Sequence, residues 1–181
     1  MPLLTAPSRP LAGSRTALIR PWLATLDRLL LAAVLLAAGG PKFLDPEGTV
    51  RSTRAFRLLP EVAVRPFAYG LPLLELLLAV LLLVGLTTRW AAAATAGLLA
   101  IFMFGISMAW IRGLSIDCGC FGGGGNTVAD PVPGYISDQV RDAVLLLLVA
   151  GLVRWPASRL SLDGALGLTT TDSPAPRKAP R

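Results

Sequence analysis

Histidine is absent from this chain of 181 residues, and cysteine occurs only twice. Histidine is the usual general base near neutral pH and a frequent ligand of metal ions. Its absence excludes serine-type catalytic triads and histidine-ligated metal or haem sites. Two cysteines are too few for a four-thiolate zinc or iron–sulfur site within one chain.

Charge is also scarce in this sequence. Charged residues make up 15% of the chain, whereas soluble domains contain roughly 25%. Hydrophobic residues make up 54%, which leaves too few polar side chains to cover a water-exposed surface. The excess apolar side chains must therefore contact lipid. We expect an integral membrane protein that is surrounded by the lipid bilayer.

The net charge of +6 would by itself suggest nucleic-acid binding. The basic residues, however, gather in the tails and the first loop, on either side of apolar segments, and no basic–aromatic platform accompanies them. Charges in such places bind anionic lipid headgroups and orient a membrane protein. The distribution therefore argues against a nucleic-acid partner.

Four apolar segments predict transmembrane helices, at residues 22–40, 66–86, 90–111 and 137–155. The first is longer than the hydrophobic core of a signal peptide, which indicates an uncleaved span. The fourth is uninterrupted only from Ala143 to Val153, so Arg141 and Asp142 must lie in the interface or face the bundle. The expected fold is all-α, an integral membrane four-helix bundle over residues 22–155. A basic, proline-rich tail (1–21) precedes it and a disordered tail (156–181) follows it.

A short helix is expected between the first two spans. Asp45 suits an N-cap, Pro46 suits the first helical turn, and Pro60 prevents continuation. The segment is too short and too polar to cross a bilayer, and arginines recur every third residue on one of its faces. These features predict an interfacial helix.

An even number of spans places both termini on the same side of the membrane. Lysine and arginine residues in the tails and the second loop outnumber those on the opposite side. This bias favours cytoplasmic termini in a bacterial plasma (inner) membrane. The loop between the third and fourth spans would then lie in an oxidising, extracytoplasmic compartment.

That loop, residues 113–134, is rich in glycine and proline and is expected to form neither helix nor regular strand. It contains Cys118 and Cys120, and a disulfide across a single glycine would be strained and therefore active in exchange. Asp117 should raise the pKa of a neighbouring thiol. An inert or idle thiol pair and a two-coordinate Cu(I) site are the alternatives. The residues expected to support the loop are Asp117, Gly119, Phe121 and Gly122.

Three charged residues fall within the first two predicted spans, namely Asp27, Arg28 and Glu75. Charges are costly in lipid, so these side chains should face the bundle interior and be paired. Their depths along oppositely directed helices predict that Arg28 approaches Glu75. The pair would either lock two helices together or line a polar pocket for a quinone headgroup or another small ligand.

Four motifs occur in a fixed order along the chain: "AGGPKFLDP" after the first span, "LPE" before the second, "PLLELLLAVLLLVGLTTRW" across it, and "CGCFGG" after the third. In their order and spacing they resemble the MauE branch of the DoxX-like membrane proteins, over about residues 22–155. The resemblance implies a four-helix membrane bundle that assists the maturation of methylamine dehydrogenase alongside a thioredoxin-like partner. It also implies that Cys118 and Cys120 carry the thiol role.

Three hypotheses about function remain open from the sequence. The first is a membrane component of extracytoplasmic thiol–disulfide exchange, acting with a thioredoxin-like protein or a periplasmic client. The second is a non-catalytic scaffold, for which the cysteines would be dispensable. The third is a small-ligand or quinone-binding protein built around Glu75. No resident cofactor is expected other than the quinone or Cu(I) of these alternatives.

Overall fold

The computed structural model describes residues 14–121, 124–127, 130–154 and 162. The predictions for residues 1–13 and for nearly all of the C-terminal tail lie outside this part of the chain. The described elements are α1 (Ser14–Leu44), α2 (Pro46–Ala55), α3 (Glu61–Val84), α4 (Thr88–Ile111), β1 (Ile116–Asp117), β2 (Gly125–Asn126) and α5 (Val132–Arg154). The fold is therefore almost entirely helical, as the sequence predicts.

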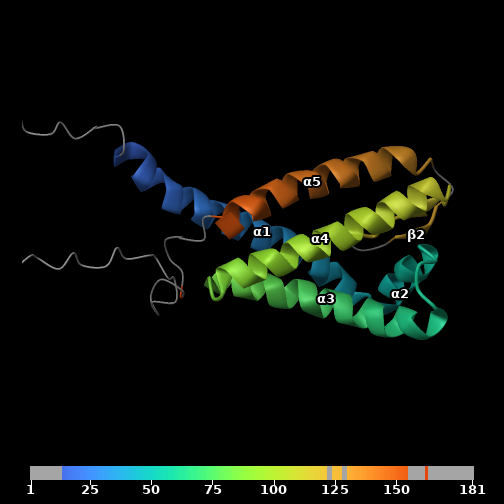
Figure 1. The fold of residues 1–181 in the computed structure, drawn as a ribbon. Coiled ribbons are helices and arrows are strands. Elements are labelled where there is room, and N and C mark those ends of the chain that lie inside the picture. The colour runs from blue at the N-terminus through green and yellow to red at the C-terminus, as the bar shows by residue number, and fades with distance from the viewer. Residues whose placement is uncertain (1–13, 122–123, 128–129, 155–161, 163–181) are drawn as a thin grey trace, which may run out of the picture.

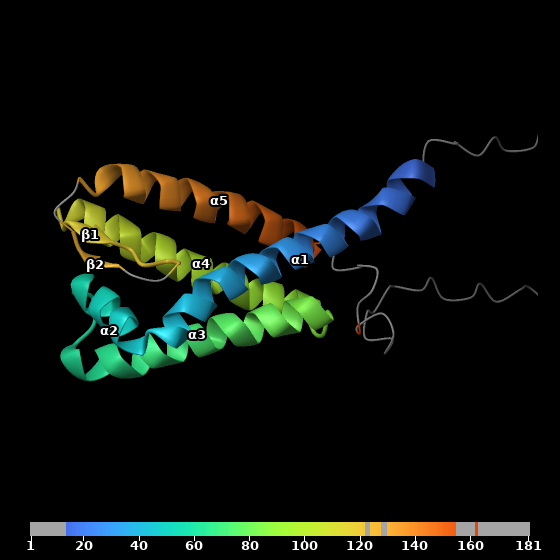
Figure 2. The ribbon, with the colours of Figure 1, turned by 180° about the vertical axis from the view of Figure 1, so that it is seen from behind.

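The four long helices α1, α3, α4 and α5 run up and down beside one another (Figure 1). The short helix α2 and the β1–β2 pair lie together at the end of the bundle where α1 ends and α5 begins (Figures 1 and 2). The first turns of α1 project beyond the opposite end (Figure 2). The loop between β1 and β2, which carries both cysteines, is thus at one end of the bundle.

Three of the helices are long and apolar enough to cross a membrane: Pro21–Leu44 in α1, Glu61–Val84 and Thr88–Ile111. Only 33–39% of the most apolar stretch of each is buried inside the protein. Most of their apolar side chains therefore face outward, where only lipid solvates them favourably. These helices make the chain a multi-pass membrane protein. α5 is not among the three, because Asp138, Arg141 and Asp142 interrupt its apolar run.

The apolar core lies between the long helices. Leu31 of α1, Leu78 and Leu82 of α3, and Val149 and Leu152 of α5 are almost completely buried in it. A second, smaller cluster is formed under the cysteine loop by residues of α2, α4, β1 and α5. This second cluster fixes the loop to the end of the bundle.

The predicted N-terminus of α2 is confirmed. Asp45 is its N-cap, and the carboxylate accepts a hydrogen bond from the Gly48 backbone N–H at 2.8 Å. Pro46 occupies the first helical turn, where its missing N–H costs nothing. α2 buries Thr49 and Ser52 on its inner face.

The end of α1 differs from the sequence-based prediction. The run Gly39-Gly40-Pro41 predicts a helix end, but α1 continues through it to Leu44. The glycines serve packing here: a Cβ on Gly39 would lie 3.0 Å from the Glu75 Cβ, so α1 and α3 approach closely at this point. The extension has a functional consequence, because it brings Lys42 onto the helix.

Two other helices also begin earlier than predicted. α3 starts at Glu61, directly after Pro60, and α5 starts at Val132, where the sequence predicts a start near Ser137. Pro133 suits the first turn of a helix, and the Ser137 hydroxyl donates to the Gly134 carbonyl at 2.8 Å within that helix. Ser137 is therefore an internal residue of α5 and not its cap.

We predict that Gly39→Val destabilises the bundle, while Gly40→Val does not. The new side chain at residue 39 would overlap Glu75 and Leu76 of α3, whereas a Cβ at residue 40 meets nothing within 4 Å. Overpacking of this kind costs about 1–3 kcal/mol. Thermal unfolding in detergent micelles should show a lower midpoint for Gly39→Val only. Equal midpoints would disprove the close packing of α1 on α3.

Candidate functional site: a cysteine pair beside an apolar pocket

The cysteines lie in a loop closed by two very short strands. β1 pairs antiparallel with β2, with Ile116 opposite Asn126 and Asp117 opposite Gly125. The prediction that residues 113–134 contain no regular strand is therefore wrong for these four residues. The pairing brings the backbone together on both sides of the Cys118–Cys120 segment.

Two glycines allow the loop to fold back on itself. Gly119, between the cysteines, has φ +66°, and Gly124 has φ +86°, backbone angles that glycine adopts without steric cost. A Cβ on Gly124 would lie 2.6 Å from the Gly119 Cα and would also overlap the Ser52 hydroxyl of α2. The loop thus packs tightly both on itself and on α2.

Tyr135 of α5 fixes the start of the loop. Its buried hydroxyl donates to the Leu114 carbonyl at 2.7 Å and accepts from the Ile116 N–H at 3.2 Å. The ring also contacts Trp110 near the end of α4. One side chain therefore joins α5 to the chain that leaves α4.

Both cysteines are half-buried free thiols, and their surroundings differ. The Cys118 thiol donates to the Asp138 carboxylate at 2.7 Å, and the Cys120 backbone N–H donates to the Cys118 sulfur at 3.3 Å. Arg141, one turn further along α5, binds Asp138 at 2.7 Å and lies 4.8 Å from the centre of the Phe121 ring. The first turns of α5 thus supply one acidic and one basic group beneath the pair.

This arrangement makes the two thiols unequal. Hydrogen bonding to Cys120, burial and the Asp138 carboxylate all raise the pKa of Cys118 above its ordinary value. The neighbouring Cys118 side chain and the Arg141 guanidinium lower the pKa of Cys120, and together they outweigh burial and the Asp138 carboxylate, which raise it. Cys120 therefore ionises first and is the better nucleophile of the two.

The acidic neighbour of the thiols is not the residue that the sequence suggests. Asp117 is adjacent in the chain, but its carboxylate accepts the Gly119 N–H at 3.1 Å and so shapes the loop. Asp138 occupies the expected electrostatic role. Asp138 and Arg141 were missed because 18 to 23 positions in the chain separate them from the cysteines. Their spacing of three residues at the start of the helix after the loop is the signal that could have identified them.

The same groups form a possible set of metal ligands. One oxygen of Asp138 and the sulfurs of Cys118 and Cys120 all lie within 4.8 Å of one another. Two sulfurs suit a soft ion such as Cu(I). The carboxylate, a harder ligand, suits it less well.

Within the membrane-spanning part, Glu75 has a different partner from the one predicted. Its carboxylate forms an ion pair with Lys42 at 2.6 Å, and both side chains are buried. The prediction that Arg28 fills this position is wrong, because α1 continues past Pro41 and so brings Lys42 to the same level of the bundle. Arg28 is buried at 2% exposure elsewhere in α1. Asp27, its neighbour, lies near Gly151 of α5.

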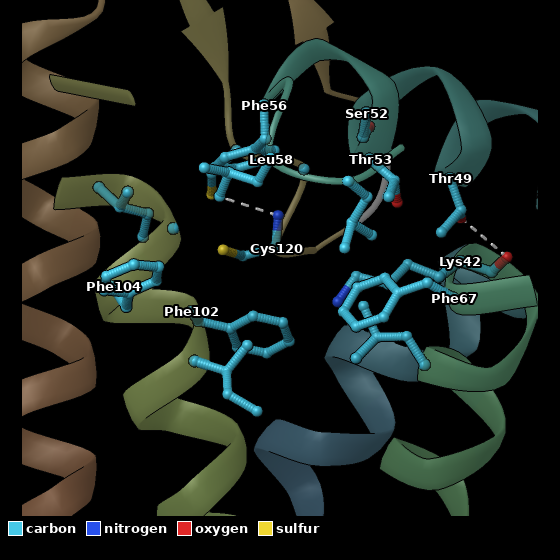
Figure 3. Close-up of a pocket in the computed structure, with 17 residues that line it drawn as sticks. Lys42, Thr49, Ser52, Thr53, Phe56, Leu58, Phe67, Phe102, Phe104 and Cys120 are labelled. Atoms are coloured by element: carbon cyan, nitrogen blue, oxygen red, sulfur yellow. Dashed lines mark hydrogen bonds between the residues drawn. The ribbon is translucent and has the colours of Figure 1, made fainter. Parts of the chain in front are cut away.

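A pocket of about 450 Å³ connects these two sets of residues. The residues that line it come from α1, α2, α3, α4, the α2–α3 connection and the cysteine loop. Its wall is mainly apolar and includes the rings of Phe56, Phe67 and Phe102, while Lys42 and both cysteines are its reactive groups. Figure 3 shows Cys120, Phe102 and Lys42 around the same space.

Fold and site together define a multi-pass membrane protein with a pair of unequal thiols at one end, beside an apolar pocket. The sequence profile of the family described as "Methylamine utilisation protein MauE" matches residues 20–155. The chain belongs to this family.

Individual relatives agree with this assignment. The chain is 34% identical to methylamine utilization protein MauE of Paracoccus denitrificans over 154 residues, which cover 83% of this chain and 81% of the relative. It is 41% identical to the protein of that name from Methylorubrum extorquens over 108 residues, 59% of this chain and 58% of the relative. No solved structure matches the chain.

We predict that Asp138→Asn makes Cys118 more reactive, while Asp117→Asn does not. The amide at residue 138 removes a negative charge that raises the pKa of Cys118. If the pKa of Cys118 falls by one pH unit, the fraction of thiolate at pH 7–8 rises about tenfold. The alkylation rate of Cys118 should rise by the same factor, because the thiolate is the reacting form. The asparagine amide oxygen at residue 117 can still accept the Gly119 N–H. Mass spectrometry of iodoacetamide-treated protein measures the rate at each cysteine, and equal rates in the two variants would contradict the assignment.

We also predict that Gly124→Ala displaces the loop, whereas Gly125→Ala leaves it in place. Both residues have positive φ, so both substitutions carry the same kind of backbone strain. Only the Cβ at residue 124 would overlap neighbouring atoms, because nothing lies within 4 Å of a Cβ at residue 125. Alkylation of both thiols should be several-fold faster in Gly124→Ala alone. An unchanged rate in that variant would show that the loop does not depend on this contact.

Proposed function

We propose that this protein exchanges disulfides with an extracytoplasmic partner through Cys118 and Cys120. The observation that carries the proposal is the geometry around the two sulfurs, which makes the thiols unequal: the Cys118 thiol donates to the Asp138 carboxylate at 2.7 Å, and the Cys118 sulfur accepts the Cys120 backbone N–H at 3.3 Å. Cys120 is activated by Cys118 and Arg141, while Cys118 is kept protonated beside Asp138. An inert structural pair needs no such difference. A pair that exchanges disulfides needs one thiolate that attacks the partner disulfide and a second thiol that resolves the mixed disulfide.

The exchange can be written as two balanced steps. The Cys120 thiolate attacks one sulfur of the partner disulfide, which forms a mixed disulfide and releases the other partner sulfur as a thiolate. Cys118 then gives its proton to the Asp138 carboxylate beside it and attacks the Cys120 sulfur, which closes the Cys118–Cys120 disulfide and expels the second partner sulfur as a thiolate. The two partner thiolates take up protons from Asp138 and from water, so the partner leaves as a dithiol. The reverse sequence oxidises a partner dithiol. A thioredoxin-like protein or a disulfide-containing client would fit either direction.

The membrane arrangement that fits this function has α5 as a fourth crossing. Asp138, Arg141 and Asp142 would then lie at the outer interface, with Asp142 facing the bundle, where it is buried. α2 would lie in the same interface as the cysteine loop. Both termini would be cytoplasmic, and the membrane would be the bacterial inner membrane. In that arrangement the thiols face the compartment where disulfides persist.

The relatives suggest which client to examine first. They are named for methylamine utilization. We infer that this chain acts in the same process, on a protein that requires correct disulfides. The resemblance described above points to methylamine dehydrogenase maturation as the setting.

We predict that Cys118→Ser traps a mixed disulfide and that Cys120→Ser does not. Without Cys118 the intermediate at Cys120 cannot be resolved, so it should accumulate several-fold over its level with Cys120→Ser. Non-reducing gels of cells that express the tagged full-length protein would show the adduct as a band that dithiothreitol removes. The double serine variant is the control. If client oxidation is unchanged in both single variants, the cysteines are dispensable and the thiol-exchange proposal is wrong, as the scaffold hypothesis would require.

A further inference from the structure

We propose that the apolar pocket binds a membrane quinone, which accepts the two electrons of the Cys118–Cys120 dithiol. This inference rests on the thiol exchange proposed above and adds the electron acceptor that repeated exchange requires. It assigns a ligand class to the space between the cysteines and Lys42.

Part of the pocket wall is exposed on the outer faces of α3 and α4. Phe67 of α3 lines the pocket and is 39% exposed on the outer surface, and Ile101 and Phe104 of α4 line it and are 54% and 58% exposed. These side chains belong to two of the candidate membrane spans, so we infer that a ligand can enter the pocket from lipid on this side. A ligand that enters this way must itself dissolve in the bilayer. A quinone meets this condition, because its apolar tail can remain in lipid while its ring enters the pocket.

The size and the wall of the pocket suit a flat ring. Its volume of about 450 Å³ is within the range of about 300–1,000 Å³ that is typical of small-molecule sites. The rings of Phe56 and Phe102 line it, and aromatic rings favour stacked or edge-to-face contact with another planar ring. A saturated acyl chain would gain nothing from these rings beyond burial.

Polar groups lie on two sides of the pocket, as a quinone requires. Quinone carbonyls project from opposite edges of the ring. Lys42 Nζ lies 4.9 Å from the centre of the Phe102 ring, and its ammonium carries three N–H donors, one of which binds Glu75. Another donor can bind one carbonyl. Cys120 lies across the same space from Lys42 (Figure 3), so the opposite edge of the ring would face the cysteine loop. Lys42 is the binding residue here, and Glu75 is a positioning residue that holds it.

The reaction balances without any further reactant. Two S–H bonds break and one S–S bond forms, and two electrons and two protons pass to the quinone, whose two carbonyls become hydroxyls. The dithiol is oxidised to the disulfide and the quinone is reduced to the quinol. The positive charge of Lys42 stabilises the negative charge that develops on the nearer oxygen as electrons arrive. The resulting disulfide would oxidise the client, so the proposal also sets the direction of exchange.

The test uses the purified full-length protein in detergent, reduced and then mixed with decylubiquinone. Every ring position of this probe is substituted, so thiols cannot add to the ring. A maleimide gel shift follows the loss of free thiols, and ultraviolet absorbance follows quinol formation. We expect one quinol for each thiol pair that is lost. In the double serine variant the quinone should still raise the midpoint of thermal unfolding, because binding does not require the sulfurs.

Gly105→Leu and Gly97→Leu are matched variants on α4. Gly105 lines the pocket and is buried, with room for a Cβ at 3.6 Å from Phe56, whereas Gly97 lies on the exposed face of α4 with nothing within 4 Å. A leucine at residue 105 should fill the pocket and slow oxidation by the quinone about tenfold or more, equivalent to about 1.4 kcal/mol. Diamide, a small oxidant that needs no pocket, should oxidise both variants equally. The Gly97→Leu protein should react with the quinone like the wild type.

A second variant removes the charges together. Lys42→Met combined with Glu75→Leu leaves no unpaired ion in the bundle, and it should abolish the thermal shift caused by the quinone while diamide still oxidises the thiols. The quinone proposal is overturned if wild-type thiols survive decylubiquinone, or if Gly105→Leu reacts as fast as wild type. It is equally overturned if native mass spectrometry finds only phospholipid in the pocket and the quinone does not displace it. If diamide-oxidised protein still forms the mixed disulfide with its partner in any of these cases, thiol exchange stands and only the quinone fails.

Discussion

The buried contact between Lys42 and Glu75 holds together the part of the bundle that carries the pocket. The Lys42 ammonium of α1 pairs with Glu75 of α3 and lies beside the Phe102 ring of α4, and the Lys42 carbonyl accepts the Thr49 hydroxyl of α2 at 3.2 Å. One residue therefore contacts three other helices. Because both charges are buried, loss of either one alone would leave an uncompensated ion, at a cost of about 3–5 kcal/mol.

The cysteine loop depends on a different set of contacts, most of them from α5. Tyr135 binds the chain on both sides of Ser115, Asp138 binds the Cys118 sulfur, and Arg141 lies against Phe121. α2 packs closely against the loop as well, through Ser52 next to Gly124. The pocket and the thiols are thus held by separate parts of the bundle that meet at the loop. This separation allows the thiol chemistry and the ligand site to be altered independently by substitution.

Local sequence signals predicted local structure well. The three candidate spans, the N-cap at Asp45 and the membership of the MauE family were all evident from the sequence. The pairing of distant residues was not. Lys42 and Glu75 are 33 positions apart, and their contact depends on α1 continuing through Pro41, a residue type that normally marks a helix end. A Gly-Gly-Pro run can end a helix or can allow two helices to pack closely. In this chain the packing of α3 against Gly39 shows that it allows close packing.

The same reason explains why the thiol environment was only partly predicted. The adjacent Asp117 was the obvious neighbour, but its carboxylate turns back onto the Gly119 N–H, and Asp138 reaches the sulfur from a helix that begins fourteen residues after Cys118. Side-chain direction, which sequence distance does not specify, decides between the two acids.

The location of all these groups at a single end of the bundle has a consequence for energy coupling. The strand pair and α2 lie near the point where α1 ends and α5 begins (Figure 2). Lys42 is in the last turn of α1, and both cysteines lie between β1 and β2. Electrons that pass from a client to the two sulfurs and on to a quinone in the pocket would stay at this end of the bundle. They would not cross the membrane along the helices. Moving one elementary charge across a full membrane potential of 100 mV is worth about 2.3 kcal/mol. A reaction confined to this end moves no such charge, so the voltage across the membrane would neither drive nor oppose it.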